Sequence, residues 1–286
     1  MLNIFMEKLK ELIKEITTNS NDMIKVTISC NYHEKSNFCR QDGKYLSDQW
    51  FDKVGGFYNG FAQIKLDGKW NFINTDGKII SDQWFDFVCN FNGVFARVQL
   101  NKKWNYINTE GKLLCDQWFD FVENFYYDGF TKVILNNKYN FINGDGKLIS
   151  DQWFDDASYF YNGFSIVQLN NKYNFINTEG KTISDQWFDW VGEFEEGFAR
   201  VEFNGKYNFI NEDGKLLCDQ RFDGVKNFYN GFGRVKLNDK FNFINTDGKI
   251  ISDQWFDDIR EFEEGFARVI LNGKCHVLNI EGILCD

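Results

Sequence analysis

The sequence contains no proline, only two histidines and no apolar stretch long enough to cross a bilayer. Without proline, every residue keeps the backbone N–H group that sheet pairing needs. Cys30, His33 and Cys39 offer three possible metal ligands without a fourth. Cys275 and His276 are neighbours on an expected strand, where adjacent side chains point to opposite faces. We therefore expect no cofactor, no metal site and no enzymatic activity.

A basic excess is also missing, because the net charge is −10. This charge argues against sequence-independent binding to nucleic acid and against electrostatic docking on an anionic membrane. The seven cysteines are odd in number and have no tight spacing, so we expect free thiols in a reducing, cytoplasmic setting. The first 17 residues carry six charges, which excludes the uncharged core of a secretory signal.

What the chain does contain is an internal repeat. The pentapeptide Asp-Gln-Trp-Phe-Asp, or its variant with Arg at the third position, recurs at intervals of 34 residues with one interval of 35. A period of this length is typical of one supersecondary unit that stacks on its neighbours. The seven copies start at Asp48, Asp82, Asp116, Asp151, Asp185, Asp219 and Asp253.

Each copy has the pattern of a β-meander. Residues 61–66 alternate between apolar and polar side chains, and the turn Asp67-Gly68 leads into a return strand at 69–74. A second turn follows at 75–78, then a third strand-like segment at 79–86 and a third turn at Asn92-Gly93. The repeats show no helical period, so the array is predicted to be all-β.

We predict an open superhelical, solenoid-like array of antiparallel hairpin repeats, with a closed seven-bladed β-propeller as the alternative. A propeller blade usually needs about 40–45 residues, and 34 is short for it. In addition, degenerate hairpins at 24–44 and 274–282 exceed what a closed ring requires. Divergent terminal copies are what an open array needs, because its ends meet water.

The chain divides into an N-terminal segment, residues 1–22, and the array, residues 23–286. Within residues 2–16, apolar side chains recur in steps of three and four, which predicts a short amphipathic helix. This helix would cap the first repeat, or alternatively serve for docking or self-association.

The repeats resemble the WG repeat family. The stretch Gly68-Lys-Trp-Asn-Phe-Ile73, the Asp76-Gly-Lys78 turn and the aromatic–Asp pair at 85–86 carry the resemblance. The glycine that gives the family its name is Asn71 here, and we expect Asn71 to keep a left-handed backbone. The resemblance implies a β-repeat array used for binding or scaffolding, without catalytic residues.

Two side-chain sets remain as candidates for function. The carboxylate pairs, such as Asp82 and Asp86, occur seven times, whereas an active site is normally built once; we expect them to accept backbone N–H bonds at turns. The second set combines aromatic residues at one strand position with outward-facing arginines, a composition that suits a protein partner. This candidate surface comprises Trp70, Trp104, Tyr139, Tyr173, Tyr207, Arg97, Arg200, Arg234 and Arg268.

We therefore predict a non-enzymatic scaffold that mediates protein–protein interaction. The alternative is a lectin-like or small-ligand-binding module, in which grooves beside the aromatic residues repeat between copies and take sugars or choline-like cations.

Overall fold

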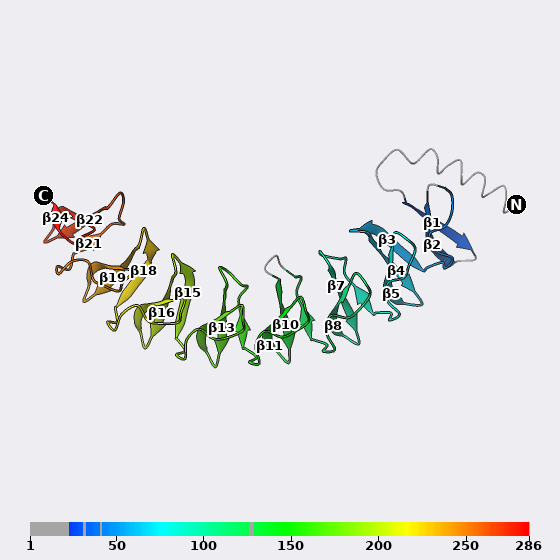
Figure 1. Cartoon of the computed structure of the whole chain (residues 1–286), viewed down its shortest axis with the longest axis horizontal. Helices are drawn as coiled ribbons and strands as arrows, with labels where there is room; N and C mark the ends of the chain where they lie inside the picture. The colour runs from blue at the N-terminus through cyan, green and yellow to red at the C-terminus, as the bar shows by residue number, and fades with distance from the viewer. Residues whose placement is uncertain (1–22, 31–32, 41, 126–128, 286) are drawn as a thin grey trace. The chain divides into compact units, whose positions relative to one another are not determined.

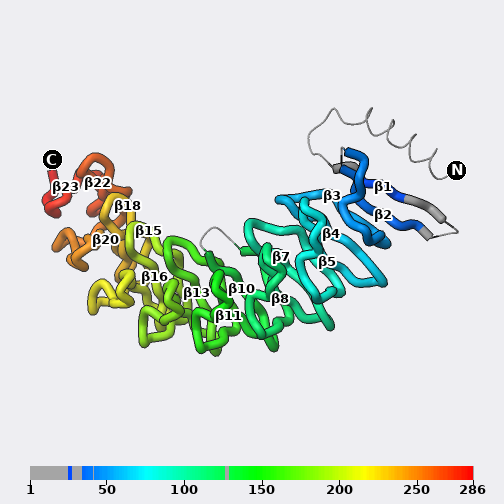
Figure 2. Tube along the Cα trace, turned by 45° about the vertical axis from the view of Figure 1, so that its right-hand side comes forward, coloured from blue at the N-terminus to red at the C-terminus, as the bar shows by residue number. Residues whose placement is uncertain are grey.

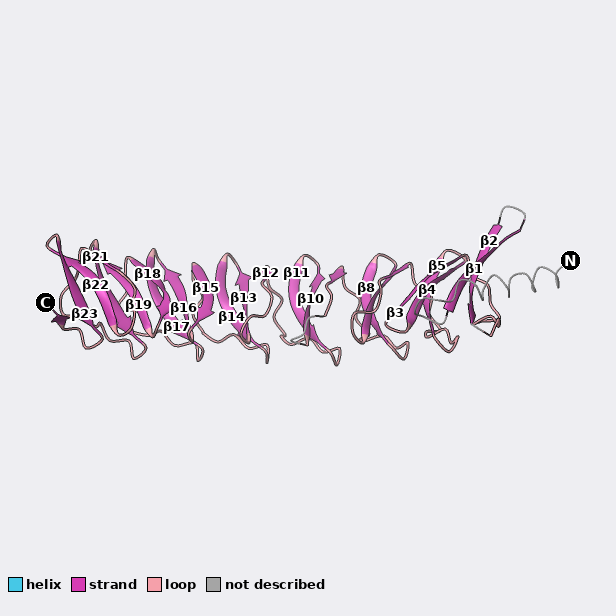
Figure 3. Cartoon of the chain, turned by 90° about the horizontal axis from the view of Figure 1, so that it is seen from above, coloured by secondary structure: helices cyan, strands magenta, loops and turns pink. Residues whose placement is uncertain are grey.

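The computed structural model describes residues 23–30, 33–40, 42–125 and 129–285. Among these residues there are 24 strands in eight antiparallel sheets, and helix is absent (Figure 3). The all-β prediction is confirmed for this part of the chain. The helix predicted over residues 2–16 lies outside the described residues. The described part contains no helix that could span a membrane.

The chain forms two compact units, residues 1–137 with 141–147, and residues 138–140 with 148–286. In each unit the sheets follow one another in chain order (Figures 1 and 2). The sheets of the first unit, whose boundary falls within β11, are β1 (Met23–Cys30) with β2 (His33–Arg40); β3 (Lys53–Tyr58), β4 (Phe61–Leu66) and β5 (Lys69–Asn74); β6 (Phe87–Val88), β7 (Phe95–Leu100) and β8 (Lys103–Asn108); and β9 (Phe121–Val122), β10 (Phe130–Leu135) and β11 (Lys138–Asn143).

The second unit repeats the same order of one leading strand and one hairpin. Its sheets are β12 (Asp156–Ala157), β13 (Phe164–Leu169) and β14 (Lys172–Asn177); β15 (Trp190–Glu195), β16 (Phe198–Phe203) and β17 (Lys206–Asn211); β18 (Gly224–Tyr229), β19 (Phe232–Leu237) and β20 (Lys240–Asn245); and β21 (Asp258–Ile259), β22 (Phe266–Leu271), β23 (Lys274–Asn279) and β24 (Leu284–Cys285).

The hairpin turns have the predicted conformation. Asp67 and Gly68 have φ values of 49° and 82°, and Asn101 and Lys102 have 50° and 64°. Two successive positive φ values are typical of a type I′ turn, whose twist matches the strands it joins. The register that follows pairs Phe95 with Asn108 at one end of the hairpin and turn-flanking residues at the other.

The third segment of each copy, such as residues 79–86, is not a continuous strand. It touches the return strand at two isolated bridges, Ile73 with Ile79 and Trp70 with Phe85. The chain then enters β6, which pairs with the hairpin of the following copy. The pentapeptide is therefore a loop that leads from one sheet to the next, and the strand-like segment predicted at 79–86 is wrong: two isolated bridges stand in its place.

The asparagine that recurs in each copy, such as Asn71, has a different role from the one expected. Asn71 and its equivalents keep negative φ, so the predicted left-handed backbone is wrong. The side chain is fully buried and its Nδ2 donates to the carbonyl oxygens of Ser81, at 2.8 Å, and Gln83, at 3.1 Å. Its Oδ1 accepts the backbone N–H of Phe72. Asn71 thus holds the pentapeptide loop against the return strand, and the same bonds recur at Asn37, Asn105, Asn140, Asn174, Asn208 and Asn242.

Apolar side chains fill the space between consecutive sheets of a unit. Ala96, Val98 and Ile107 lie on one face of a hairpin and pack against Phe72 and Phe91, which belong to the preceding copy. All five are buried. Each sheet therefore completes its core only with the help of its neighbour, as expected for a stacked repeat.

Candidate functional site

The opposite face of each hairpin carries the side chains that reach solvent. In the sheet β6–β8 the register places Phe87 opposite Gln99 and Gln99 opposite Trp104. Cross-strand neighbours lie on the same face, so these three side chains form one strip. Phe87 is 47% exposed, which is high for a phenylalanine, and Trp104 is half-buried.

The strip continues to the following sheet of the first unit. The ring of Trp104 lies 6.0 Å from that of Phe87 and 6.3 Å from that of Phe121, edge-on in both cases. Phe121 is 40% exposed. We call Phe87, Trp104 and Phe121 the aromatic row. Edge-to-face pairs of this kind fix ring orientations, so the aromatic row is an ordered apolar surface.

A cation accompanies the aromatic row. The guanidinium carbon of Arg97 lies 5.8 Å from the Trp104 ring centroid, within range of a cation–π interaction. Arg97 also donates from Nη1 to the carbonyl oxygen of Val122 at 3.2 Å, which ties it to the next sheet. Arg97 and Trp104, two residues of the predicted candidate surface, thus lie together.

Trp70, one copy earlier, has lysines in place of arginine. The ammonium groups of Lys65 and Lys53 lie 5.3 and 5.9 Å from its ring. In the second unit the guanidinium carbon of Arg200 lies 5.2 Å from the ring centroid of Trp190, which is 38% exposed. An aromatic ring beside a cation is therefore a recurring feature of this face.

The other predicted site residues have varied environments. Tyr207 bonds to Glu202, which raises the pKa of the Tyr207 hydroxyl. The Tyr173 hydroxyl accepts a bond of 2.9 Å from Gln168 Nε2, and Tyr139 is half-buried. Arg234 forms an ion pair of 3.0 Å with Glu261, and Arg268 is exposed.

Sequence reasoning missed Phe87, Phe121 and Trp190. Each directly follows the second aspartate of a pentapeptide, where the other copies carry lysine, aspartate or glycine. The sequence did contain a signal for these three residues, because a large aromatic side chain stands at a position where the other copies have a charged residue or glycine.

The second aspartate of each pentapeptide is structural. The carboxylate of Asp86 accepts bonds from the Lys69 ammonium group and from the backbone N–H of Asn101 in the next hairpin turn. The lysine, followed by the backbone donor, lowers the pKa of Asp86. The same arrangement recurs with Asp52, Asp120, Asp155, Asp189, Asp223 and Asp257. The expected acceptance of a backbone N–H bond is thus observed for the second aspartate, but the donor lies in the next hairpin turn, 15 residues away for Asp86, and not in a turn of the pentapeptide itself. A metal-binding group of three or more residues is absent from the described ranges.

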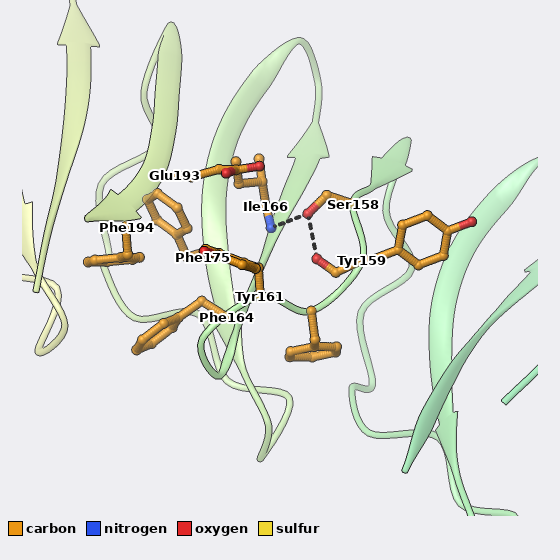
Figure 4. Close-up of a pocket in the computed structure, with 9 residues that line it drawn as sticks. Ser158, Tyr159, Tyr161, Phe164, Ile166, Phe175, Glu193 and Phe194 are labelled. Carbon is orange, nitrogen blue, oxygen red and sulfur yellow. Dashed lines mark hydrogen bonds between the residues drawn. The ribbon is translucent and has the colours of Figure 1, made fainter. Parts of the chain in front are cut away.

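A pocket of about 280 Å³ opens between two sheets of the second unit (Figure 4). Phe164 and Phe194, whose rings lie 4.6 Å apart, and Phe175 line its apolar side, while Glu193 and Ser158 lie nearby. The ring of Tyr159 points away from these three phenylalanines (Figure 4). The first unit has a pocket of about 530 Å³ at the same place in the repeat, beside the Phe95–Phe125 pair.

A smaller pocket, of about 160 Å³, lies on the strip face of the sheet β18–β20. Its lining residues are Gly224, Val225, Lys226, Arg234, Val235, Lys236 and Phe241.

Comparison with solved structures found proteins that are distantly similar to this chain. Hsv2p of Kluyveromyces lactis is 13% identical over 68% of this chain and 74% of its own, with a TM-score of 0.29. A eukaryotic initiation factor is 8% identical over 95% of this chain and 88% of its own, with a TM-score of 0.33. Scores this low carry no conclusion about fold or function. The comparison with curated proteins found no match.

The sequence pattern of the WG containing repeat matches this chain six times. The matched residues are 51–70, 72–104, 141–173, 175–207, 209–241 and 243–275, which together make up more than half of the sequence. With the hairpin, the two turns and the aromatic–Asp loop in each matched copy, the chain belongs to the WG containing repeat family.

Proposed function

We propose that this protein is a non-enzymatic scaffold that binds a protein partner on the strip face of its sheets. The observation that carries the proposal is the aromatic row, in which two exposed phenylalanines flank Trp104 and Arg97 covers its ring. Aromatic residues and arginine are the types enriched at the centre of protein interfaces.

The chemistry of the chain favours a protein over other macromolecules. The net charge of −10 opposes binding to nucleic acid phosphates and to anionic lipid headgroups. A cytoplasmic location accords with the free thiols of Cys39, Cys89, Cys115, Cys218, Cys275 and Cys285.

An open superhelical array would present this face over its whole length. Two features support an open array over a closed ring. Each described sheet consists of strands that are consecutive in the chain, so the sheets are not closed by a strand from the opposite terminus. The ring of Phe232 lies 4.2 Å from that of Phe262, which is between β21 and β22, whereas Phe266, at the position of Phe232 in the last sheet, is 51% exposed. Small-angle scattering should give a radius of gyration clearly above the compact value of roughly 19 Å; a value near 19 Å would favour the ring.

Selection from a displayed peptide library tests the binding proposal. Peptides enriched on the full chain should bind at least about tenfold more weakly to the double variant Phe87→Ser, Phe121→Ser. Tyr58→Ser is the matched control, because Tyr58 is an exposed aromatic residue in the same unit outside the aromatic row. Equal binding by the double variant and the control, for every enriched peptide, would overturn the assignment of binding to the aromatic row.

A small-ligand module is the second candidate, favoured by the pockets beside Phe164 and Phe95 that occupy the same place in the repeat. Aromatic rings beside Glu193 suit a quaternary ammonium ion. If this candidate holds, choline should raise the melting temperature with several sites per chain, by mass action on the folded state. A stoichiometry below two would count against repeated sites.

A further inference from the structure

The pocket on β18–β20 exists because one side chain of the strip is missing. Gly224 pairs with Lys236, as Phe87 pairs with Gln99 and Trp190 pairs with Glu202. Gly224 therefore stands where three other sheets place an exposed aromatic ring, Phe87, Phe121 and Trp190. The floor that such a ring would cover includes Phe241, the equivalent of Trp104.

The size of the pocket fits one side chain. Its volume of about 160 Å³ is well below the roughly 300–1,000 Å³ of sites that enclose whole small molecules. Pockets that receive single aromatic anchors are typical of the energetic centres of protein interfaces.

Positive charge surrounds the pocket. Lys226, Arg234 and Lys236 belong to its lining, which contains no acidic residue. Arg234 is paired with Glu261, and Lys236 is paired with Asp239, a side chain that is almost fully exposed. Lys226 is exposed, and among the residues that the structure describes it forms no ion pair. The charge of the lining thus complements an apolar side chain that has carboxylate groups on neighbouring residues.

We infer that this pocket receives one aromatic side chain of a protein partner, and that acidic residues flanking the side chain pair with Lys226 and Lys236. The inference rests on the proposed function, because it names the chemistry of the partner that the strip face would bind. The incoming ring takes the place that Phe87 and Trp190 occupy in their own sheets, and it covers Phe241.

Substitution of Gly224 tests the inference directly. A Cβ atom at Gly224 would have Lys236 Cβ as its nearest neighbour, at 3.8 Å, which is ordinary van der Waals contact. Gly224→Trp should therefore fill the pocket as Trp190 fills its own position, whereas Gly224→Ala leaves most of it open. The alanine variant is the matched control, because both substitutions add a Cβ atom and restrict the backbone at residue 224, but only tryptophan fills the pocket. Circular dichroism establishes that both variants fold.

The probe is an acetylated peptide with fluorotryptophan between pairs of glutamates, observed by fluorine NMR in a titration with the full chain. The expected dissociation constant is on the order of 1 mM or below, because a single anchor supplies the contact. Gly224→Ala should retain binding, and Gly224→Trp and Lys226→Glu should each weaken it by about tenfold or more. A peptide with lysines in place of the glutamates should bind similarly weakly.

Absence of binding to the unmodified chain, or equal binding by Gly224→Trp, overturns the inference. Neither result affects the aromatic row, since Phe87 and Phe121 belong to the other unit and are tested by the library selection. Conversely, the double variant Phe87→Ser, Phe121→Ser should bind this probe like the unmodified chain. Loss of probe binding in that double variant would also overturn the assignment to Gly224.

Discussion

The side-chain amide of Asn105 donates a hydrogen bond of 2.8 Å to the carbonyl oxygen of Cys115, ten residues later. A second bond of 3.1 Å reaches the carbonyl oxygen of Gln117, and Asn105 Oδ1 accepts the N–H of Tyr106. One buried side chain therefore satisfies two carbonyl groups of a loop that has little sheet pairing of its own and one N–H group of strand β8. Because buried polar groups are costly when unpaired, this amide is expected to contribute strongly to stability.

Replacing Asn105 by alanine should lower the free energy of unfolding by about 1–3 kcal/mol, since it leaves backbone groups without partners in the interior. Urea denaturation followed by tryptophan fluorescence measures the change. Gln117→Ala, at an exposed side chain in the same loop, should stay within about 0.5 kcal/mol. Similar losses in both variants would contradict the role of the amide.

Gly111 and Gly68 both have positive φ, 85° and 82°, but only Gly111 meets a neighbour. A Cβ atom at Gly111 would overlap the carbonyl oxygen of Ile80 in the preceding copy, whereas the space around Gly68 is open. Gly68→Ala should cost about 1–2 kcal/mol through backbone strain alone. Gly111→Ala should cost more, because two copies must also move apart. Denaturation midpoints that rank the two variants the other way would exclude this account of the stacking.

Acid should destabilise the fold through the seven aspartates bonded to lysine and to a hairpin turn. The pKa of Asp86 is lowered in the folded state, so its contribution is fully present above the unfolded value, about 3.9, and disappears as the pH falls through the folded value. The denaturation midpoint of the unmodified chain should fall between about pH 7 and about pH 3. In Asp86→Asn this fall should be smaller, because the variant lacks one of the titrating carboxylates. Asp82→Asn, which changes an exposed aspartate of the same pentapeptide, should keep the full difference; a reduction as large as in Asp86→Asn would refute the assignment.

Tyr106 and Thr131 form a pair specific to one place in the array. The buried Tyr106 hydroxyl donates to the carbonyl oxygen of Glu123 and lies 3.1 Å from Thr131 Oγ1, where the preceding pair of sheets has Phe72 and Ala96. Burial is the main reason why the pKa of Tyr106 is raised. Tyr106→Phe and Thr131→Ala should each cost about 0.5–1.5 kcal/mol. The double variant should be more stable than the sum predicts, with a coupling of at least about 0.5 kcal/mol in a double-mutant cycle. Strict additivity would show that the two hydroxyls act independently.

Local chemistry allowed much of the fold to be predicted. The alternation at residues 61–66 and the Asp67-Gly68 turn specify a hairpin without reference to any other part of the chain, because side-chain period and positive φ are properties of adjacent residues. The interval of 34 residues then implies that the unit is repeated. The aromatic residues at one strand position could be recognised in the sequence as a candidate surface, but the sequence does not tell which of their side chains are exposed.

Only the tertiary structure decided what three positions do. Asn71 occupies a family glycine position, yet its amide serves the loop near Ser81, and that contact depends on how the chain returns. Phe87 is exposed and Phe85 is buried, although they are two residues apart, because the chain leaves one sheet for the next between them. Gly224 lines a pocket only because Lys236 and Phe241 lie beside it across two strands. The sequence determines which units form. The packing of each sheet against its neighbours determines which side chains stay exposed, since burial is a property of the assembled stack.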